Sequence, residues 1–423
     1  MAVNYYVIIG NSFASVAAIE AIRRNDAKNP ITVIAEESRI AYGKPLISYL
    51  LEGKVSPQQM TYRDSDFYQK NKVQLILGNK VVEVDAANRN VAMSSGDRLE
   101  FERLLIASGS RPFLPPIAGL NLKNVFTFVT WDDIEKLQKI AAPTKKAVVI
   151  GAGLIGLKAA ESLTKIGVKV TVIELADYAL STVLDKGSAQ IIQSVFEKAG
   201  VNFYFQTTVD EISGYNKAEK VKLRNGMELD CDFVVVAIGV IPNIELVKKS
   251  EFKTKRGILV DQYLQTNVEG IYAAGDVAEV YDPATDQYLW RPILPNAVRQ
   301  GKIAGRNMSG EKVEFDNVIA LNATTFFDLP VVSLGMSNVV DEKYEILEQR
   351  NDTENLVKRI VLQNEVVVGA ILVGKIDRAG IFRGLIKNRL NVRDFKEQLL
   401  KPDFGLIHLP KEYWYKEFTG EKI

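Results

Sequence analysis

Three glycines and one acid form the clearest chemical pattern in the sequence. Gly151, Gly153 and Gly156 follow an apolar run and open a helical pattern, and Glu174 comes about 20 residues later. The first glycine permits a tight turn, the second lets the backbone approach a pyrophosphate, and the third lets the helix pack on the strand. The helix N-terminus, at Leu154 and Ile155, then offers N–H groups to the phosphates. These residues predict a dinucleotide site.

The residues after the acid indicate which nicotinamide nucleotide is bound. A carboxylate at Glu174 can accept both hydroxyls of a ribose and would repel a 2′-phosphate. The next residues, Leu175 to Tyr178, include no Arg or Lys that could hold such a phosphate. We therefore expect NADH rather than NADPH.

A second, degenerate copy of the pattern lies near the N-terminus. Gly10 keeps the first glycine position, but Ser12 and Ser15 stand in the other two. Glu36 occupies the place of the ribose-binding acid. Taken alone, this segment leaves open whether it binds a nucleotide or only makes a structural turn.

Composition excludes several other kinds of site. The single cysteine, Cys231, rules out an intrachain disulfide, a CxxC pair and a multi-cysteine metal site. The single histidine, His408, rules out a multi-histidine metal site, and we expect no metal. Lys and Arg number 53 against 52 Asp and Glu, so the net charge of +1 gives no support to nucleic-acid binding.

Short Val/Ile-rich runs alternate with helical patterns along the chain. One series leads from a strand at 6–9 to a strand at 31–34, and another from 147–150 to 170–173. Such runs are typical of parallel strands that are buried on both faces and joined by helices, so we predict an α/β fold. No apolar run reaches the roughly 20 residues of a membrane span, and the first residues do not read as a signal peptide. We expect a cytoplasmic protein.

Later segments make the sequence resemble the FAD-dependent pyridine nucleotide–disulfide oxidoreductase superfamily over roughly residues 3–310. Strands that end in small residues and glycine precede Gly109 and Gly239, and Ala274-Gly275-Asp276 follows another strand. The order of these motifs matches the family. The resemblance implies two Rossmann-like dinucleotide-binding domains of the glutathione-reductase type and a C-terminal α+β interface domain.

The resemblance also implies domain boundaries and ligand contacts. We expect an FAD-binding domain in two parts (1–115 and 241–315), an NAD-binding domain (116–240) and a C-terminal interface or dimerisation domain (316–423). Gly239 joins the expected NAD contacts. The expected FAD contacts are Gly10, Ser12, Phe13, Ala14, Glu36, Lys44, Pro45, Val82, Ala107, Ser108, Gly109, Arg111, Gly275, Asp276, Asn296 and Ala297. In the family the acid at Asp276 binds the ribityl chain, and the helix near Asn296 points its N-terminus at the pyrimidine end of the flavin.

The segment after the first acid separates branches of the family. Many relatives carry a redox cysteine there, but residues 40–50 contain none. The pattern Tyr42-x-Lys44-Pro45-Leu46-x-Ser48 instead resembles NADH:rubredoxin reductases, ferredoxin reductases of oxygenase systems, and the flavin domain of assimilatory nitrite reductase. In these proteins hydride passes from NADH to FAD, and electrons leave singly to an iron–sulfur or rubredoxin-type acceptor. We interpret Cys231, in an apolar strand, as core packing.

One departure from the family concerns charge near the flavin. Relatives commonly have an acid two residues after the third glycine, where this chain has Lys158, and Tyr49 stands where ferredoxin reductases have a partner lysine. We therefore expect Lys158, with Lys44 nearby, to act as a catalytic cation that favours anionic reduced flavin. The alternative is that Lys158 faces solvent.

The last hundred residues resemble the family's third domain more weakly. We expect antiparallel strands at 326–335 and 366–374, helices around 377–400, and an aromatic tail with Tyr413, Trp414 and Tyr415. Aromatic residues are enriched in interface cores, so the tail indicates a subunit or partner surface or packs on its own domain. We expect His408 to be structural, with a proton donor near the flavin as the alternative.

These observations predict an FAD-dependent NADH:acceptor oxidoreductase that feeds rubredoxin, ferredoxin or another iron–sulfur protein or subunit, or that runs in reverse to NAD. A cysteine-independent NADH oxidase and an FAD relay subunit of a larger redox complex are the alternatives. We expect a homodimer or a subunit of a complex.

Overall fold

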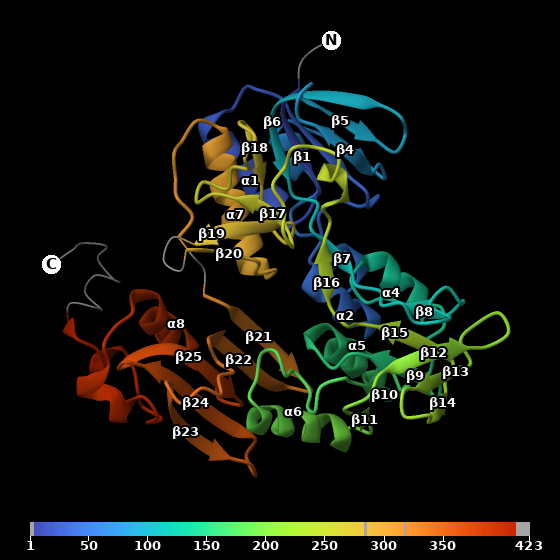
Figure 1. Ribbon diagram of the computed structural model, residues 1–423, viewed down its shortest axis with the longest axis vertical. Helices are drawn as coiled ribbons and strands as arrows, with labels where there is room; N and C mark the ends of the chain where they lie inside the picture. Colours follow the sequence, from blue (N-terminus) through green and yellow to red (C-terminus); the bar gives the residue numbers. More distant parts are fainter. Residues whose placement is uncertain (1–3, 283–285, 317–318, 412–423) are drawn as a thin grey trace. The chain divides into compact units, whose positions relative to one another are not determined.

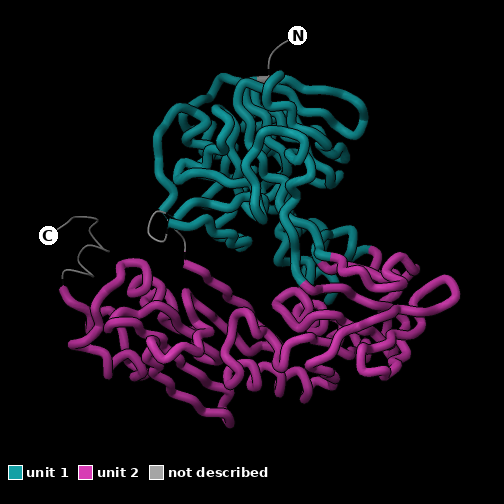
Figure 2. Tube along the Cα trace, viewed as in Figure 1, with its two compact units in different colours: residues 1–113, 129–135, 239–318 teal, residues 114–128, 136–238, 319–423 magenta. Residues whose placement is uncertain are grey.

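The computed structural model describes residues 4–282, 286–316 and 319–411. The chain divides into two compact units (Figure 2), each built from segments that are distant in sequence. Unit 1 holds residues 1–113, 129–135 and 239–318, and unit 2 holds residues 114–128, 136–238 and 319–423. The aromatic tail at 413–415 lies outside the described residues. No helix in the described ranges has both the length and the apolar character needed to cross a membrane.

Unit 1 is built on a sheet whose core strands are parallel. The strand order is β3-β2-β1-β6-β5-β4, and β18 pairs with β6. The bounds are β1 Asn4–Ile9, β2 Ile31–Ala35, β3 Val73–Leu77, β4 Val81–Asp85, β5 Asn90–Met93, β6 Arg98–Ile106 and β18 Ile271–Ala273. Strands β1, β2, β3, β6 and β18 run parallel, whereas β4 and β5 add an antiparallel hairpin. The predicted parallel strands at 6–9 and 31–34 are confirmed.

Two helices, α1 (Phe13–Asn25) and α7 (Leu294–Met308), pack closely together beside this sheet (Figure 1). Small residues allow the approach, because a Cβ at Gly301 would lie 2.0 Å from the carbonyl oxygen of Ala14. Helix α7 carries proline in its first turn, where a missing N–H costs nothing. The remaining short elements are α2 Ile47–Leu51, α3 Phe67–Lys70, β7 Ser110–Pro112, β16 Val240–Pro242, β17 Ile258–Val260, β19 Ala278–Asp282 and β20 Gln287–Leu289.

Unit 2 contains a second parallel sheet with the order β11-β10-β9-β15-β8. Its strands are β8 Val125–Phe126, β9 Lys146–Ile150, β10 Lys169–Ile173, β11 Asn202–Tyr204 and β15 Phe233–Val236. Helices α5 (Leu154–Lys165) and α6 (Lys186–Lys198) connect them, and α4 (Trp131–Gln138) spans the boundary between the units. A small antiparallel sheet follows, with β12 Val209–Ser213, β13 Lys220–Leu223 and β14 Glu228–Asp230. The second predicted βαβ series is confirmed.

The C-terminal part of unit 2 is an antiparallel sheet in the order β21-β22-β25-β24-β23. The strands are β21 Leu321–Phe326, β22 Leu329–Gly335, β23 Glu345–Asn351, β24 Leu356–Gln363 and β25 Val366–Val373, and α8 is Ala379–Asn388. The sequence predicted one strand from 326 to 335, but the segment starts with a turn. Phe327 and Asp328 both have left-handed backbone angles and join β21 to β22 as a hairpin.

Candidate functional site: two dinucleotide fingerprints

The first fingerprint makes a tight turn between β1 and α1 in unit 1. Gly10 has φ +102°, and a Cβ there would lie 2.1 Å from the carbonyl oxygen of Ala107. No other residue could adopt this angle at this distance. Ser12 is the N-cap residue of α1, with extended backbone angles and no side-chain cap. The N-terminus of α1, with Phe13 and Ala14, is therefore placed to offer backbone donors to an anion.

The serine in the third glycine position is compatible with this turn. Ser15 is completely buried, and its hydroxyl donates a hydrogen bond to the carbonyl oxygen of Gly10 at 2.7 Å. The side chain thus satisfies a carbonyl that a glycine would leave to other donors.

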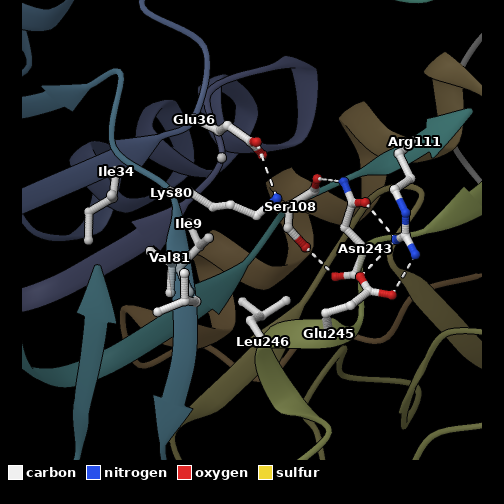
Figure 3. A pocket seen from close by; sticks show the side chains of 12 residues that line it. Ile9, Ile34, Glu36, Lys80, Val81, Ser108, Arg111, Asn243, Glu245 and Leu246 are labelled. Atoms are coloured by element: carbon white, nitrogen blue, oxygen red, sulfur yellow. Dashed lines mark hydrogen bonds and ion pairs between the residues drawn. The ribbon is translucent and has the colours of Figure 1, made fainter. Parts of the chain in front are cut away.

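A pocket of about 370 Å³ opens at the carboxyl ends of β1 and β2 (Figure 3). Such edges of parallel sheets are the usual place for ligands. Five predicted FAD contacts line it together with further residues: Ile9, Gly10, Ile34, Glu36, Lys80, Val81, Val82, Ser108, Arg111, Asn243, Glu245 and Leu246. Glu36 is exposed at the end of β2, and the Lys80 ammonium lies 3.2 Å from its carboxylate.

One wall of this pocket is a network that sequence reasoning missed. The guanidinium of Arg111 donates to both carboxylate oxygens of Glu245, at 2.7 and 2.6 Å, and to the side-chain oxygen of Asn243. Asn243 in turn exchanges two hydrogen bonds with Ser108 (Figure 3). Arg111 thus lines the pocket with its charge paired, and its contact with FAD stays a prediction. Lys80 and Glu245 belong to no sequence motif from which a place in this pocket could have been predicted.

Lys44 is held by a second network in unit 1. Its ammonium lies 3.0 Å from Glu37, and the Tyr42 hydroxyl donates to the other oxygen of that carboxylate at 2.7 Å. The same hydroxyl accepts the backbone N–H of Trp131 at 3.0 Å. Burial, followed by the charge of Glu37, raises the pKa of Tyr42. The cation of Lys44 is therefore fixed in orientation, whereas Pro45 beside it is exposed.

Asp276 follows β18 and is partly buried. The Ser110 hydroxyl donates to its carboxylate at 2.7 Å, and the Trp290 ring N–H donates to its backbone oxygen. Burial raises the pKa of Asp276, and the Ser110 hydrogen bond and the charge of Lys44 offset part of that rise. Lys44 therefore lies close enough for its field to reach Asp276. A partly buried carboxylate of this kind is suited to accept further hydrogen bonds from hydroxyl groups.

The N-termini of α1 and α7 meet beside Asp276. Gly275 lies between Ala14 and Ala297, with an ideal Cβ position 3.4 and 3.7 Å from their Cβ atoms. Asn296 is 2% exposed, and among the described residues its side-chain oxygen has no hydrogen-bond partner. The predicted FAD contacts Ser12, Phe13, Ala14, Gly275, Asp276, Asn296 and Ala297 thus surround the ends of these two helices.

The second fingerprint lies between β9 and α5 in unit 2. Gly151 has φ +104°, and its ideal Cβ would lie 2.5 Å from the carbonyl oxygen of Ala237. A Cβ at Gly156 would lie 1.9 Å from the carbonyl oxygen of Gly151, whereas Gly153 has open space. Gly151 and Gly156 thus have a steric need for glycine, and the approach of a pyrophosphate to Gly153 stays a prediction.

The acid of the second fingerprint is bound to the backbone of the turn. Glu174 accepts the N–H of Ala152 at 2.6 Å and the N–H of Ala176 at 2.9 Å. These bonds hold the carboxylate beside the fingerprint, where the ribose is expected. Gly239 belongs to unit 1, with its carbonyl bound to the N–H of Phe113, so its contact with NAD stays a prediction.

Lys158, in the first turns of α5, is 17% exposed and does not point freely into solvent. Its ammonium lies 2.6 Å from Glu161 and 3.2 Å from the carbonyl oxygen of Thr325 in β21. Glu161 is 1% exposed and also binds Lys165 and the N–H of Phe327. Burial opposes ionisation of Glu161, but the hydrogen bonds from Lys158 and Lys165 outweigh it and lower its pKa. Two lysines on one carboxylate leave one net positive charge here.

Cys231 packs in an apolar cluster of unit 2 and is 7% exposed. Burial, followed by the carboxylates of Asp232 and Asp230, raises its pKa to about 12. The thiol is therefore protonated at neutral pH and is a poor nucleophile. The Nδ1 atom of the His408 ring lies within hydrogen-bond distance of the backbone N and O of Gly405, three residues earlier.

Two family models match this chain. The family model described as pyridine nucleotide-disulphide oxidoreductase matches residues 4–304, and the model for the rubredoxin NAD⁺ reductase C-terminal domain matches residues 321–390. The chain belongs to the pyridine nucleotide-disulphide oxidoreductase family. It is accordingly an oxidoreductase that uses FAD and NAD(H), as the sequence predicted.

Individual relatives are similar over nearly the whole chain. The epsilon subunit of NADH-dependent phenylglyoxylate dehydrogenase from Aromatoleum evansii is 32% identical over 93% of this chain and 94% of its own length. The nitrite reductase [NAD(P)H] of Bacillus subtilis is 31% identical over 94% of this chain, which spans about half (49%) of that protein. Among solved structures, the covalent putidaredoxin reductase–putidaredoxin complex aligns with a TM-score of 0.85, 25% identity and coverage of 92% and 94%.

The residues present fit the two cofactors of this family. In unit 1, the Gly10 turn is suited to a pyrophosphate, the exposed Glu36 to a ribose and the partly buried Asp276 to a polyhydroxyl chain. The unpartnered oxygen of Asn296 at the start of α7 can accept a ring N–H. In unit 2, the Gly151 turn and Glu174 repeat the first two features for NAD(H).

Proposed function

We propose that this protein oxidises NADH and passes the electrons singly to a rubredoxin-type or other iron–sulfur protein. When bound, FAD takes up the hydride of NADH as an electron pair and returns the electrons one at a time, so one NADH reduces two acceptors and releases one proton. The state of Cys231 is the observation that carries this proposal. The chain has no other cysteine, and this one is a buried, protonated thiol. Electrons therefore have no thiol route out of the protein.

The remaining residues have roles within this proposal. Glu36, the Gly10 turn and Asp276 hold FAD in unit 1, and Glu174 with the Gly151 turn holds NADH in unit 2. Lys44 and Lys158 supply positive charge toward the reduced flavin. This assigns FAD to 1–115 and 241–315, NADH to 116–240, and an interface role to 316–423. The C-terminal match to the rubredoxin reductase domain supports this choice of acceptor.

A second candidate is a subunit of a larger redox complex. The coverage of the phenylglyoxylate dehydrogenase epsilon subunit, 94% of its length, favours it. In that case the acceptor would be an iron–sulfur subunit of the same assembly rather than a free carrier. We also propose a cytoplasmic location, which suits an unpaired thiol because reducing compartments keep thiols free.

The test is anaerobic and aerobic turnover of the purified yellow protein with NADH. We expect reduction of a rubredoxin or a ferredoxin at least about tenfold faster than oxygen consumption. Oxygen consumption that accounts for all NADH oxidation would instead establish an NADH oxidase. Affinity capture from native extract distinguishes the free enzyme from the subunit, because a subunit co-purifies with iron–sulfur partners in fixed ratio.

The Asp276→Asn variant tests the cofactor assignment separately. Burial raises the pKa of Asp276, so its ionised form lowers the stability of the cofactor-free protein above that pKa. Stability from this group is fully present below the unfolded pKa and is lost as pH rises through the higher folded value. We expect the variant to unfold at an equal or higher temperature at pH 7 but to retain less FAD. Unchanged FAD retention would remove Asp276 from the site.

A further inference from the structure

The turn of the first fingerprint contains an asparagine that no motif singled out. Asn11 follows Gly10 directly, and its side-chain oxygen accepts a hydrogen bond from the Tyr68 hydroxyl at 2.7 Å. Tyr68 belongs to α3, so its closeness to the turn depends on the tertiary structure. The ring of Tyr68 is 7% exposed and packs edge-on against Phe67.

The donors and acceptors around Tyr68 favour one orientation of the Asn11 amide. The Tyr68 oxygen accepts the backbone N–H of Ala41 at 3.2 Å. Its single hydroxyl proton is therefore available for the Asn11 side-chain oxygen, and a reversed amide would leave that proton without an acceptor among the described residues. The side-chain NH₂ group of Asn11 consequently points away from Tyr68.

That NH₂ group has no hydrogen-bond partner among the residues that the structure describes. The nitrogen is buried, and no described residue accepts a hydrogen bond from it. A buried donor without an acceptor lowers the stability of the folded protein, so such a group indicates a missing acceptor. It lies in the turn where glycine is replaced at Ser12 and Ser15, and next to the N-terminus of α1.

We propose that the Asn11 side-chain nitrogen donates to a pyrophosphate oxygen of FAD, and that Tyr68 is the positioning residue that aims it. This inference rests on the FAD site proposed above for unit 1. A phosphate oxygen is an anionic acceptor, and hydrogen bonds to charged groups are stronger than neutral ones. The turn thus contributes a side-chain donor to the phosphates, in addition to the backbone amides that a glycine-rich turn offers.

An aspartate at position 11 separates this role from a structural one. Asp keeps an oxygen that accepts the Tyr68 hydrogen bond, so a merely structural role survives in Asn11→Asp. The same change removes the donor and places a negative charge beside the phosphates. Tyr68→Phe keeps the NH₂ donor of Asn11 but removes the hydroxyl that orients the amide. Tyr272→Phe is a matched control, since Tyr272 is a similarly buried ring of the same core, and its hydroxyl lies 3.5 Å from the carbonyl oxygen of Asn307.

The experiment measures FAD dissociation from the holoprotein on dilution, by the recovery of flavin fluorescence, together with the unfolding temperature by circular dichroism. We expect Asn11→Asp to weaken FAD binding by about 100-fold and Asn11→Ala by about tenfold. Tyr68→Phe should weaken it by a few-fold, and Tyr272→Phe should not change it. The unfolding temperatures of the FAD-free Asn11→Asp and wild-type proteins should agree within a few degrees.

ADP and adenosine, as competitors of FAD, show which part of the cofactor is contacted. Asn11→Asp should weaken competition by ADP, which carries the pyrophosphate, and should leave competition by adenosine unchanged. Equal FAD and ADP affinities in the Asp, Ala and wild-type proteins would overturn the inference. If Asn11→Asp does not fold, Asn11→Ala and Tyr68→Phe decide by the same criteria. A wild-type protein that binds no FAD would refute the FAD site itself and not only the role of Asn11.

Discussion

The two fingerprints reach the same strand–turn–helix arrangement with different residues. In unit 2 the carbonyl oxygen of Gly151 lies 1.9 Å from the ideal Cβ position of Gly156, so only glycine fits. In unit 1 the corresponding carbonyl, that of Gly10, accepts the hydroxyl of Ser15 at 2.7 Å. The first turn is thus open enough for a side chain, which then bonds the turn. A glycine in this pattern therefore indicates a close backbone contact. A sequence that lacks the glycine can still form the same strand–turn–helix arrangement.

The acids of the two sites differ in a related way. Glu174 is fixed by two backbone N–H groups, whereas Glu36 is exposed and paired with Lys80. The Glu174 carboxylate is therefore held in place before any ligand binds. The Glu36 carboxylate is oriented by Lys80, which is itself exposed, and an exposed ion pair of this kind contributes little to stability.

Exchanging the third fingerprint residue should have the largest effect. Gly156→Ser forces the Cβ against the Gly151 carbonyl, and we expect NADH binding to weaken by about 100-fold, or roughly 3 kcal/mol. Ser15→Gly loses one hydrogen bond and should lower the free energy of unfolding by only about 1–2 kcal/mol. NADH titration measures the loss of binding in Gly156→Ser, and urea unfolding measures the loss of stability in Ser15→Gly. Losses of equal free energy in the two variants would show that the two turns are equivalent.

The acids should control different cofactors. With Glu174 fixed beside the ribose, we expect kcat/KM to favour NADH over NADPH by about 100-fold, because a 2′-phosphate would meet a like charge. Glu174→Ala should narrow this ratio to about tenfold or less, whereas Glu36→Ala should leave it unchanged and weaken FAD retention. A wild-type enzyme that used NADPH as well as NADH would contradict the assignment of Glu174.

The lysines around Glu161 test whether charge at the start of α5 matters for the reaction. Lys158→Met and Lys165→Met each remove one cation from the same buried carboxylate, but only Lys158 lies near the fingerprint end of the helix. We expect both variants to lose similar stability. Only Lys158→Met should slow reduction of a one-electron dye, by a few-fold, with little change in NADH affinity. Equal dye rates in the two variants would assign Lys158 a purely structural role.

Cys231→Ser should have the smallest effect. The thiol is buried and protonated, and Ser has nearly the same size, so the cost is that of placing a hydroxyl in an apolar cluster. We expect NADH:dye turnover within a few-fold of wild type. Loss of turnover in a variant that still folds and retains FAD would show that electrons use the thiol.

Both fingerprints, the parallel strands that precede them and the family could be predicted from the sequence. These features are local, because strand, turn and helix follow one another within about 30 residues and each glycine has a steric reason. The C-terminal hairpin was predicted less well. The turn at Phe327 and Asp328 contains no glycine, and its left-handed angles are maintained by strand pairing.

Side-chain partners were decided by the tertiary structure. Arg111 with Glu245, Ser110 with Asp276, Lys158 with Thr325 and Asn11 with Tyr68 are separated by 134, 166, 167 and 57 residues. Periodicity indicates which face of an element is buried, but not which element covers that face. Lys158 shows the consequence, since its position in the helix was predicted from the fingerprint, whereas its burial against Glu161 and β21 depends on where the C-terminal hairpin packs. The sequence by itself thus determined the family and the two nucleotide-binding turns, and the packing of distant segments determined which charges around those turns are paired.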